Sequence, residues 1–302
     1  MNQHANMQRL VILVAVSITV SAIIPLFRLL DTPALDFKSY YIAGHLAIEG
    51  NNIYLPDQQL RIATEQNLGS HFYPYIYFPM IAVMIMPLAM IPFQTAQWIW
   101  TILSLLAWFT GLAILTGLLH RKIVHFDPQV QQWKTATQWV LTVSILAGIS
   151  ESIALGQINT FSFLLLTLFL AATDENHPAA AGFCLGVLCL IKPQPALLIP
   201  YLFLVHRART AWVAVTVALT GTATTASVIG WNYFKYYLKE VMPTFSMIET
   251  SFPPIMIQSP PNRSIYGAIA RLGLDSPWTT AWFHNSVLVL VGIRLSVLFI
   301  LT

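Results

Sequence analysis

The sequence predicts an all-α integral membrane protein, a polytopic helical bundle of about eight membrane-embedded helices packed as one domain over 1–302. The first observation is composition. Hydrophobic residues make up 56% of the chain and charged residues only 9%, whereas an ordinary soluble domain carries about 25% charged residues. The second observation is that charge-free runs recur, several of them long enough to cross most of a bilayer. They span 10–27, 98–119, 135–150, 152–173, 211–234 and 276–293, and a further segment, 178–205, is interrupted by one lysine.

The composition also excludes several classes of function. A net charge of +3 is too small and too scattered to indicate a nucleic-acid partner. Cys184 and Cys189 lie five residues apart on one apolar segment and point to different sides of a helix, so neither a disulfide nor a metal clip is expected. The chain has no Gly-rich phosphate loop, no HExxH and no Gly-x-Ser-x-Gly elbow. We therefore expect no metal and no cofactor.

After the first apolar run, a polar loop at 31–76 holds five of the twelve acids. Within it, the spacing of apolar residues over 36–49 predicts an amphipathic helix that ends at Gly50. We expect this helix to lie along the membrane interface, with Tyr40 and Tyr41 at the depth of the lipid headgroups.

The next apolar run, 80–93, is short and carries Pro87 and Pro92, which predicts a broken or tilted passage. A longer helix is expected from about 97 to 119. Segments 138–155 and 157–173 follow, hinged at 156–159, and a tight turn at 174–178 leads into the segment that contains Lys192. Pro193 and Pro195 should break that helix. A helix at 211–230 leads to a second polar loop, 231–277, with a helical stretch at 265–272.

Orientation follows from the short loop that contains Arg207 and Arg209, because short basic loops favour the cytoplasm. Counting outward from it predicts a multi-pass protein of the cytoplasmic (inner) membrane with both long loops, 31–76 and 231–277, outside. The same count places the basic stretch 120–137 outside, which is against the rule.

Asp36 is the first candidate for chemistry, and it has two interpretations. It stands where an N-cap belongs, before a predicted helix, and aspartate is among the best capping residues. Alternatively, a carboxylate at the boundary between water and lipid can act as a base on a hydroxyl whose partner substrate is held in the membrane.

Two ionisable residues interrupt apolar sequence, Glu151 and Lys192. A charge within a membrane costs at least ~2.5 kcal/mol, so it normally faces a cavity or a partner. One interpretation is an intramembrane ion pair between the two. The other places Lys192 against a lipid phosphate, which a compact cation suits well.

Two polar segments each have a purely structural and a functional interpretation. Gln157 and Asn159 interrupt two apolar helices, either as a turn or as amides that bind sugar hydroxyls. The segment 257–264 contains Gln258, Asn262 and Arg263 and precedes a helical stretch. It is either a solvated proline-rich loop or a phosphate site at a helix N-terminus.

Several short blocks of sequence follow one another in a characteristic order between residues 35 and 272. They are Asp36-Phe37-x-x-Tyr40-Tyr41-x-Ala43-Gly44, Gly50-x-x-x-Tyr54, Tyr77-Phe78-Pro79 with Met86-Pro87-Leu88-Ala89, Gly156-Gln157-x-Asn159, Leu190-Ile191-Lys192-Pro193 within Gly182–Pro195, and Gln258-Ser259 with Asn262-x-Ser264. Together they resemble the polyprenol-phosphate-mannose-dependent mannosyltransferases, glycosyltransferase family 87. The chain departs from the family in having Phe78 between Tyr77 and Pro79, and in stopping inside an apolar helix at 300–302, from which we expect a terminal helix or two to be missing.

The resemblance implies a C-type glycosyltransferase whose active site lies at the outer face of the membrane. The donor would be a polyprenyl-phosphate sugar, most often mannose, the acceptor a lipid or glycan, and the reaction inverting. Asp36 matches the catalytic acid of the family, which favours the general-base interpretation. Lys192 and Arg263 would then bind the donor phosphate, while amides and tyrosines would bind sugar or acceptor: Tyr40, Tyr41, Gln157, Asn159, Gln258 and Asn262.

Two other classes compete with this prediction. Broken helices and charges near the bilayer midplane are also features of transporters and lipid flippases. Against that class, the halves of the chain show no repeat, and most polar residues lie in two loops on one predicted side. A member without activity, or an assembly subunit that has lost its C-terminal helices, is the third class.

Overall fold

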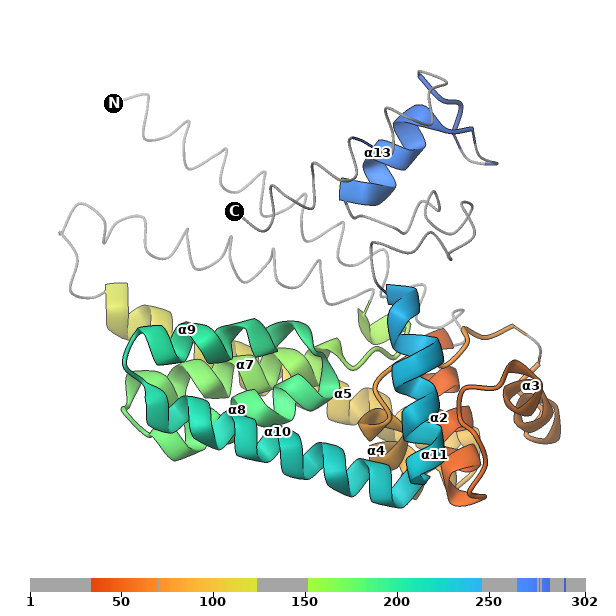
Figure 1. The fold of residues 1–302 in the computed structure, drawn as a ribbon, viewed down its shortest axis with the longest axis horizontal. Coiled ribbons are helices and arrows are strands. Elements are labelled where there is room, and N and C mark those ends of the chain that lie inside the picture. Colours follow the sequence, from red (N-terminus) through yellow and green to blue (C-terminus); the bar gives the residue numbers. More distant parts are fainter. Residues whose placement is uncertain are drawn as a thin grey trace. The chain divides into compact units, whose positions relative to one another are not determined.

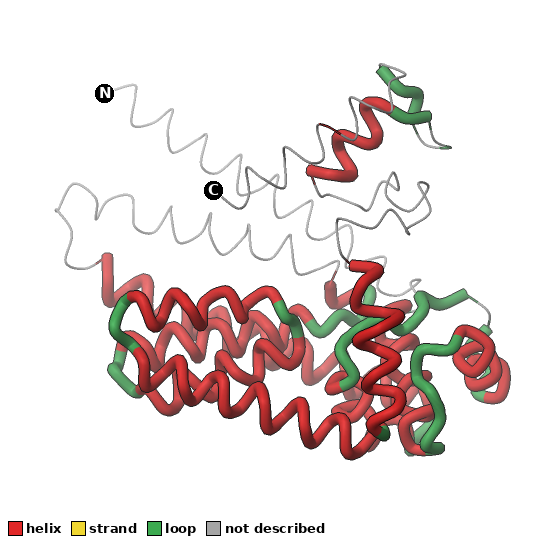
Figure 2. Tube along the Cα trace, viewed as in Figure 1, coloured by secondary structure: helices red, strands yellow, loops and turns green. Residues whose placement is uncertain are grey.

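The computed structural model describes residues 34–69, 71–123, 152–245, 265–275, 277, 279–282 and 291. The regular elements in these ranges are all helical, which confirms the all-α class for this part of the chain (Figure 2). The chain forms two compact units, 1–237 and 238–302. Sequence analysis predicted one domain over 1–302.

Unit 1 carries most of the described helices (Figure 1). They are α2 (Leu35–Ile48), α3 (Pro56–Glu65), α4 (Met80–Ala89), α5 (Phe93–Ile123), α7 (Asn159–Asp174), α8 (Pro178–Ile191), the 3₁₀ turn η1 (Gln194–Leu197), α9 (Leu198–Leu204), α10 (Ala208–Ile229) and α11 (Trp231–Tyr236). A π-helical turn η2 (Tyr237–Val241) and a 3₁₀ turn η3 (Met242–Phe245) follow, and unit 2 also contains α13 (Ile265–Gly273).

Proline sets several of these boundaries, as the sequence predicts. Pro56 and Pro178 stand in the first turn of α3 and α8, where a missing backbone N–H costs nothing. The apolar passage after residue 80 is broken between α4 and α5, next to Pro92, and α8 ends at Ile191, just before Pro193. Both predicted breaks are confirmed.

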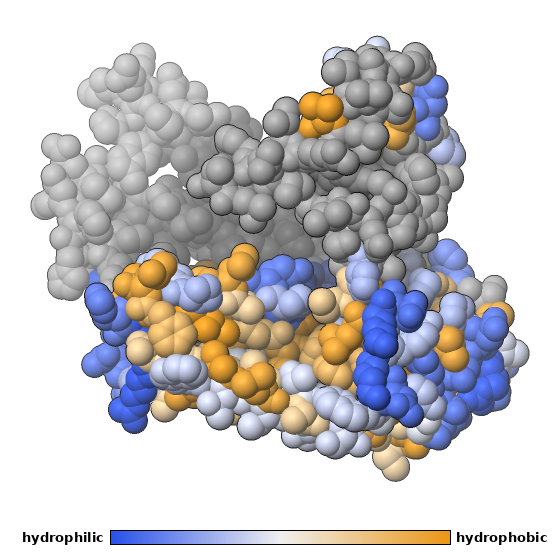
Figure 3. Space-filling view, viewed as in Figure 1, coloured by the Kyte–Doolittle hydropathy of each residue, from blue (hydrophilic) through white to orange (hydrophobic). Residues whose placement is uncertain are grey.

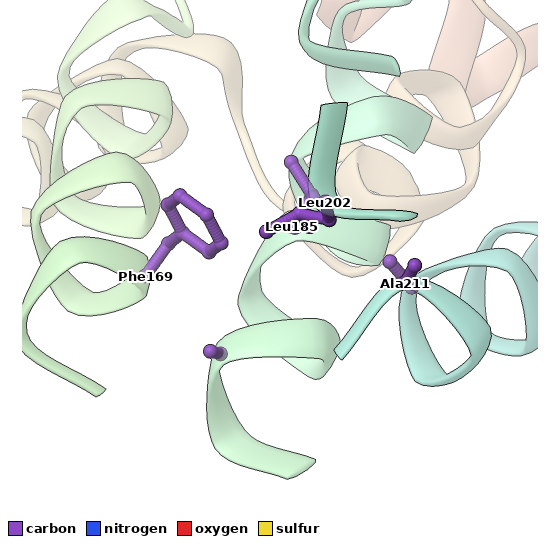
Figure 4. Close-up of a cluster of buried hydrophobic side chains, with 6 residues drawn as sticks. Phe169, Leu185, Leu202 and Ala211 are labelled. Carbon is purple, nitrogen blue, oxygen red and sulfur yellow. The ribbon is translucent and has the colours of Figure 1, made fainter. Parts of the chain in front are cut away.

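Helices α7, α8, α9 and α10 lie side by side (Figure 1) and share an apolar core. Figure 4 shows its central side chains, Phe169 from α7, Leu185 from α8, Leu202 from α9 and Ala211 from α10. All four are buried. Burial of a leucine or phenylalanine side chain stabilises a fold by roughly 1.5–3 kcal/mol, so this core fixes the bundle.

Glycines allow α8 and α10 to approach closely. A methyl group on Gly182 would stand 2.5 Å from the carbonyl oxygen of Thr210, and one on Gly186 would stand 2.6 Å from Cβ of Val217. The spacing Gly-x-x-x-Gly places both on one face of α8, the pattern by which apolar helices pack in membranes.

Four helices end in the same tight turn. A left-handed residue follows the helix, and the next N–H donates to the carbonyl five residues earlier, which is a Schellman motif. The left-handed residues are Gly50, Asn67, Asn176 and His206, and the closing bonds are Asn51 to Leu46, Leu68 to Ala63, His177 to Ala172 and Arg207 to Leu202. The predicted helix end at Gly50 and the predicted turn at 174–178 are therefore confirmed.

Two described helices are long and apolar enough to cross a bilayer, Phe93–Leu118 within α5 and Ala208–Ile229 in α10. Their surfaces carry many exposed apolar side chains, such as Leu106, Phe109 and Leu219. Helices α4, α7, α8 and the η1–α9 segment are apolar but have 10–17 residues each. The prediction of about eight membrane-embedded helices is thus met only in part, and the apolar runs 10–27 and 135–150 lie outside the described residues.

The prediction that the helix over 36–49 is amphipathic is wrong. α2 does form at Leu35–Ile48, but twelve of its 14 residues are buried, Tyr40 and Tyr41 among them. Its lysine is buried because it has partners in the fold: Lys38 Nζ donates to the carbonyl oxygens of Leu68 at 2.8 Å and His71 at 3.1 Å. α2 is therefore a core helix without a polar, solvent-facing side, and its depth in the membrane stays a prediction.

We expect Gly186→Ala to weaken the α8–α10 contact. The added methyl group must displace Val217 or the backbone of α10, and overpacking of this kind costs about 1–3 kcal/mol. Gly117→Ala in α5 is the matched control, because its methyl group meets nothing within 4 Å and an alanine in a helix stabilises by ~0.5–1 kcal/mol. Thermal unfolding in detergent measures both variants, and equal midpoints would contradict the close packing.

Candidate functional site

Asp36 lies inside the first turn of α2 and is buried, with 4% of its surface exposed. The residue at the N-cap is Ala34, which is left-handed (φ 37°), and no side chain caps the helix. The capping interpretation of Asp36 is therefore wrong. The N–H groups of Asp36 and Phe37 donate to the carbonyl oxygen of Leu155, at 3.0 and 3.3 Å, so the chain before α7 takes the place of a cap.

The Asp36 carboxylate accepts a hydrogen bond from the hydroxyl of Tyr77, at 2.7 Å. Tyr77 belongs to the connection between α3 and α4. Burial, the neighbouring Tyr40 and the charge of Asp36 all raise the pKa of Tyr77 well above its usual value. Its hydroxyl therefore stays protonated and remains a donor to Asp36.

Tyr40 lies one turn further along α2 and is fully buried beside Tyr77, with ring centroids 5.0 Å apart. Burial and, next, the Asp36 charge raise the pKa of Tyr40 as well. The Asp36 carboxylate is thus bordered by two neutral phenols. Tyr41 serves another purpose, because its hydroxyl donates to the carbonyl oxygen of Ile91 at 2.7 Å and holds α2 against the α4–α5 connection.

The polar break at 156–159 forms a small hydrogen-bond network with Lys192. Lys192 Nζ donates to Oδ1 of Asn159 at 2.5 Å, and the Asn159 amide donates to Oε1 of Gln157 at 2.5 Å and to Oγ of Ser152 at 3.0 Å. Ser152 donates in turn to Gln157 at 3.1 Å. Gln157, Asn159 and Lys192 are each partly exposed, so a ligand can reach them.

Lys192 stands in extended conformation in the connection that follows α8. Burial lowers the pKa of its ammonium group, and the charge of Asp36 raises it. Lys192 and Asp36 therefore share one electrostatic site, although they are 156 positions apart in the chain. Within the part of the chain that the structure describes, no carboxylate forms an ion pair with Lys192.

Gly156 lets the polar network approach α2. Its φ is +70°, and a methyl group on it would stand 2.6 Å from Cβ of Phe37. The Gly156 carbonyl oxygen accepts a hydrogen bond from the indole of Trp100, at 2.8 Å. Trp100 also stacks on Phe37, with centroids 5.4 Å apart. This contact joins α2, α5 and the polar break into one rigid wall.

The structure thus brings together five of the residues that the sequence singled out: Asp36, Tyr40, Gln157, Asn159 and Lys192. The hydroxyl of Tyr41, by contrast, is occupied by its hydrogen bond to the carbonyl oxygen of Ile91, which has a structural role. Four predicted site residues lie outside the described residues: Glu151, Gln258, Asn262 and Arg263. The predicted ion pair between Glu151 and Lys192 therefore also lies outside them. Within the described ranges, no three of His, Cys, Asp and Glu stand close enough to hold a metal ion.

Sequence reasoning missed Tyr77, Ser152 and Trp100 as parts of this site. Tyr77 stands in the dense aromatic segment 73–78, and a tyrosine between prolines and ahead of an apolar helix is a detectable signal. Ser152 and Trp100 have no such mark, because a serine or tryptophan in an apolar run is common in any membrane helix. Chemically, the site joins two phenols that stay protonated to one carboxylate, one ammonium group and two amides. Such a set suits proton removal beside a bound anion.

Comparison with known proteins identifies relatives. The model of glycosyltransferase family 87 matches residues 75–302, a range that includes Tyr77, Gln157, Asn159 and Lys192 and begins after Asp36. A polyprenol-phosphate-mannose-dependent alpha-(1-2)-phosphatidylinositol pentamannoside mannosyltransferase of Mycobacterium tuberculosis (strain CDC 1551 / Oshkosh) is 27% identical over 209 residues, 67% of this chain and 44% of that protein.

A second curated relative is a polyprenol-phosphate-mannose-dependent alpha-(1-2)-phosphatidylinositol mannoside mannosyltransferase of M. tuberculosis (strain ATCC 25618 / H37Rv). It is 25% identical over 266 residues, 85% of this chain and 58% of that protein. The chain therefore spans about half the length of the curated relatives it matches. No solved structure matches the chain.

We expect Gly156→Ala to destabilise the protein more than the same substitution at a left-handed glycine elsewhere in the chain. An alanine at positive φ costs about 1–2 kcal/mol, and the contact with Phe37 adds about 1–3 kcal/mol. Gly69→Ala is the matched control, since it shares the left-handed backbone (φ +71°) but meets nothing within 4 Å. Thermal unfolding compares the two variants, and an equal loss of stability would contradict close packing of the polar break on α2.

Proposed function

The chain belongs to glycosyltransferase family 87, and on that basis we propose that it is a membrane glycosyltransferase. It transfers a hexose, mannose in the first instance, from a polyprenyl-phosphate donor to a lipid or glycan acceptor. The names of both curated relatives, which describe polyprenol-phosphate-mannose-dependent mannosyltransferases, support this donor. The observation that carries the proposal is the buried Asp36 carboxylate, held by Tyr77 and electrostatically coupled to Lys192.

Asp36 acts as the general base. An acceptor hydroxyl attacks the anomeric carbon of the donor, the bond from that carbon to the phosphate oxygen breaks, and the hydroxyl proton passes to the Asp36 carboxylate. The phosphate leaves with the bonding electron pair, and the configuration at the anomeric carbon inverts. A positioned base of this kind contributes on the order of 10²–10⁴-fold to the rate.

Tyr77 supports this role by fixing one carboxylate oxygen. Its hydroxyl occupies Oδ1 of Asp36, which leaves Oδ2 for the acceptor. The backbone bonds from the start of α2 to Leu155 hold the aspartate in place, so that attack geometry is set before the substrates bind.

Lys192 acts on the leaving group. Negative charge grows on the bridging phosphate oxygen as the bond breaks, and a nearby ammonium group stabilises it. Asn159 orients Lys192 through the bond to its Oδ1, while Gln157 and Asn159 present amides of the kind that bind sugar hydroxyls. Arg263, Gln258 and Asn262 are proposed to complete the donor site, as the sequence predicts.

The protein is further proposed to span the cytoplasmic membrane several times, with the Asp36 site at the outer face. The exposed apolar surfaces of α5 and α10 support insertion in lipid. The Lys192 end of the bundle is opposite the basic turn that contains Arg207 and Arg209, because α8 and α10 run between the two ends (Figure 1). Basic short loops favour the cytoplasm, which places Lys192 and Asp36 on the other side.

We expect Asp36→Asn to abolish sugar transfer, because an amide cannot accept the proton. The assay follows label from polyprenyl-phosphate mannose into a membrane lipid extract, and we expect a loss of at least about 100-fold. Asp57→Asn is the matched control, since Asp57 is an exposed carboxylate in the first turn of α3. Full activity of a folded Asp36→Asn variant would refute the role of the base.

We expect Lys192→Ala to weaken binding of the donor and to slow its cleavage, because the phosphate loses its cation. Lys235→Ala removes an exposed lysine of α11 and serves as the control. Donor affinity is measured by competition with unlabelled polyprenyl phosphate. The proposed phosphate role does not survive if Lys192→Ala and Lys235→Ala bind polyprenyl phosphate equally well.

A further inference from the structure

A second polar feature lies at the end of the helical bundle away from Asp36. A hollow of about 290 Å³ opens between the α7–α8 turn and the α9–α10 turn. Helix α7 has 16 residues, so this hollow lies roughly 24 Å from the start of α7 at a rise of 1.5 Å per residue. It is therefore separate from the Asp36 site, and the proposed transfer reaction does not use it.

The lining of the hollow is cationic. Arg207, Arg209, His177 and His206 line it, and none of the residues that line it is an aspartate or glutamate. Glu175 of the α7–α8 turn is engaged by Arg121 at 3.2 Å and lies 3.8 Å from His177. The two arginines thus bring positive charge to the hollow, and no carboxylate is among its lining residues.

One of the arginines is available to a ligand. Arg207 donates to the carbonyl oxygen of Thr173, at 3.1 Å, which fixes its guanidinium at the wall. Arg209 forms no side-chain hydrogen bond or ion pair with any described residue. Oγ1 of Thr173, which also lines the hollow, is shielded from solvent and has no hydrogen-bond partner in the described ranges. A bound oxygen atom would satisfy these groups.

Backbone donors point to the same class of ligand. α10 begins at the hollow with Arg209 and Thr210 in the lining, and no side chain caps its first turn. Unpaired N–H groups in a first turn, together with the helix dipole, favour an anion. Arginine binds phosphate oxygens through two parallel N–H donors.

The surroundings indicate where such a phosphate comes from. Trp212 (62% exposed) and Leu204 (78% exposed) stand beside the two turns, and Phe203 packs edge-on against Trp212. Figure 3 shows hydrophilic residues gathered at this end of the bundle next to an apolar surface. Tryptophan beside basic residues is typical of the depth at which lipid headgroups lie.

We propose that this hollow binds the phosphate group of an anionic lipid headgroup at the membrane face opposite the Asp36 site. Arg207 and Arg209 hold the phosphate oxygens, the first turn of α10 supplies N–H donors, and the acyl chains run along the exposed apolar side chains of α9 and α10. The bound lipid ties the two turns together from outside.

The test compares lipid retention by the full chain in detergent. The protein is mixed with equimolar phosphatidylglycerol and phosphatidylcholine, and bound lipid is counted by native mass spectrometry. Wild type should retain phosphatidylglycerol preferentially, and Arg209→Gln should reduce that preference roughly fivefold, with a larger loss in Arg207→Gln/Arg209→Gln. Lys235→Gln is the control, because it removes the same charge from exposed α11.

Arg209→Gln removes no side-chain hydrogen bond or ion pair within the described residues, so it keeps the comparison valid even if the double variant does not fold. A parallel arm titrates inorganic phosphate. Preferential retention of phosphatidylglycerol that is lost in the arginine variants supports the lipid headgroup. Binding of inorganic phosphate that Arg209→Gln abolishes, without any preference for phosphatidylglycerol in wild type, shows that a phosphate site exists but overturns the lipid as its source. Equal lipid retention by wild type and Arg209→Gln, or an equal loss in Lys235→Gln, overturns the site.

Discussion

The architecture of the Asp36 site depends on one backbone acceptor, the carbonyl oxygen of Leu155. It receives the N–H groups of Asp36 and Phe37, which would otherwise be unpaired donors at the start of a buried helix. An unpaired buried donor costs about 1–3 kcal/mol, so the contact both satisfies α2 and fixes its position. The segment that supplies this oxygen is the one that continues through Gly156 into Gln157 and Asn159. Asp36 and the two amides are thereby held in one frame.

That frame explains why residues far apart in sequence meet. Gly156 permits the contact, because a larger residue would collide with Phe37. Trp100 closes it from α5 through a hydrogen bond to the Gly156 carbonyl oxygen. Asn159 then begins α7 and orients Lys192, which stands where α8 is broken before Pro193. Helix breaks, rather than continuous helices, supply the polar groups, because regular apolar helices leave no backbone or side-chain group free inside a membrane protein.

At both ends of the α7–α10 bundle, polar residues gather where helices begin or end, but the two ends present different chemistry. At one end, a broken helix and a polar turn surround a carboxylate. At the other, two Schellman turns, at Asn176 and His206, bring helix starts and arginines together without a carboxylate in the lining. Apolar helices connect these two ends, so the proposed transfer site and the proposed lipid site stand on one scaffold.

The sequence by itself determined the helical class, the broken passages at Pro92 and Pro193, the stop at Gly50 and the turn at 174–178, because proline, glycine and hydrophobic period act locally. It also singled out Asp36, Gln157, Asn159 and Lys192, since a polar residue in apolar sequence needs a reason to be there. Only the tertiary structure decided the rest. The burial of α2 depends on partners for its lysine, the carbonyl groups of Leu68 and His71. The role of Asp36 depends on the position of Tyr77, which donates a hydrogen bond to its carboxylate. Such contacts join segments tens of residues apart, and no local pattern encodes them.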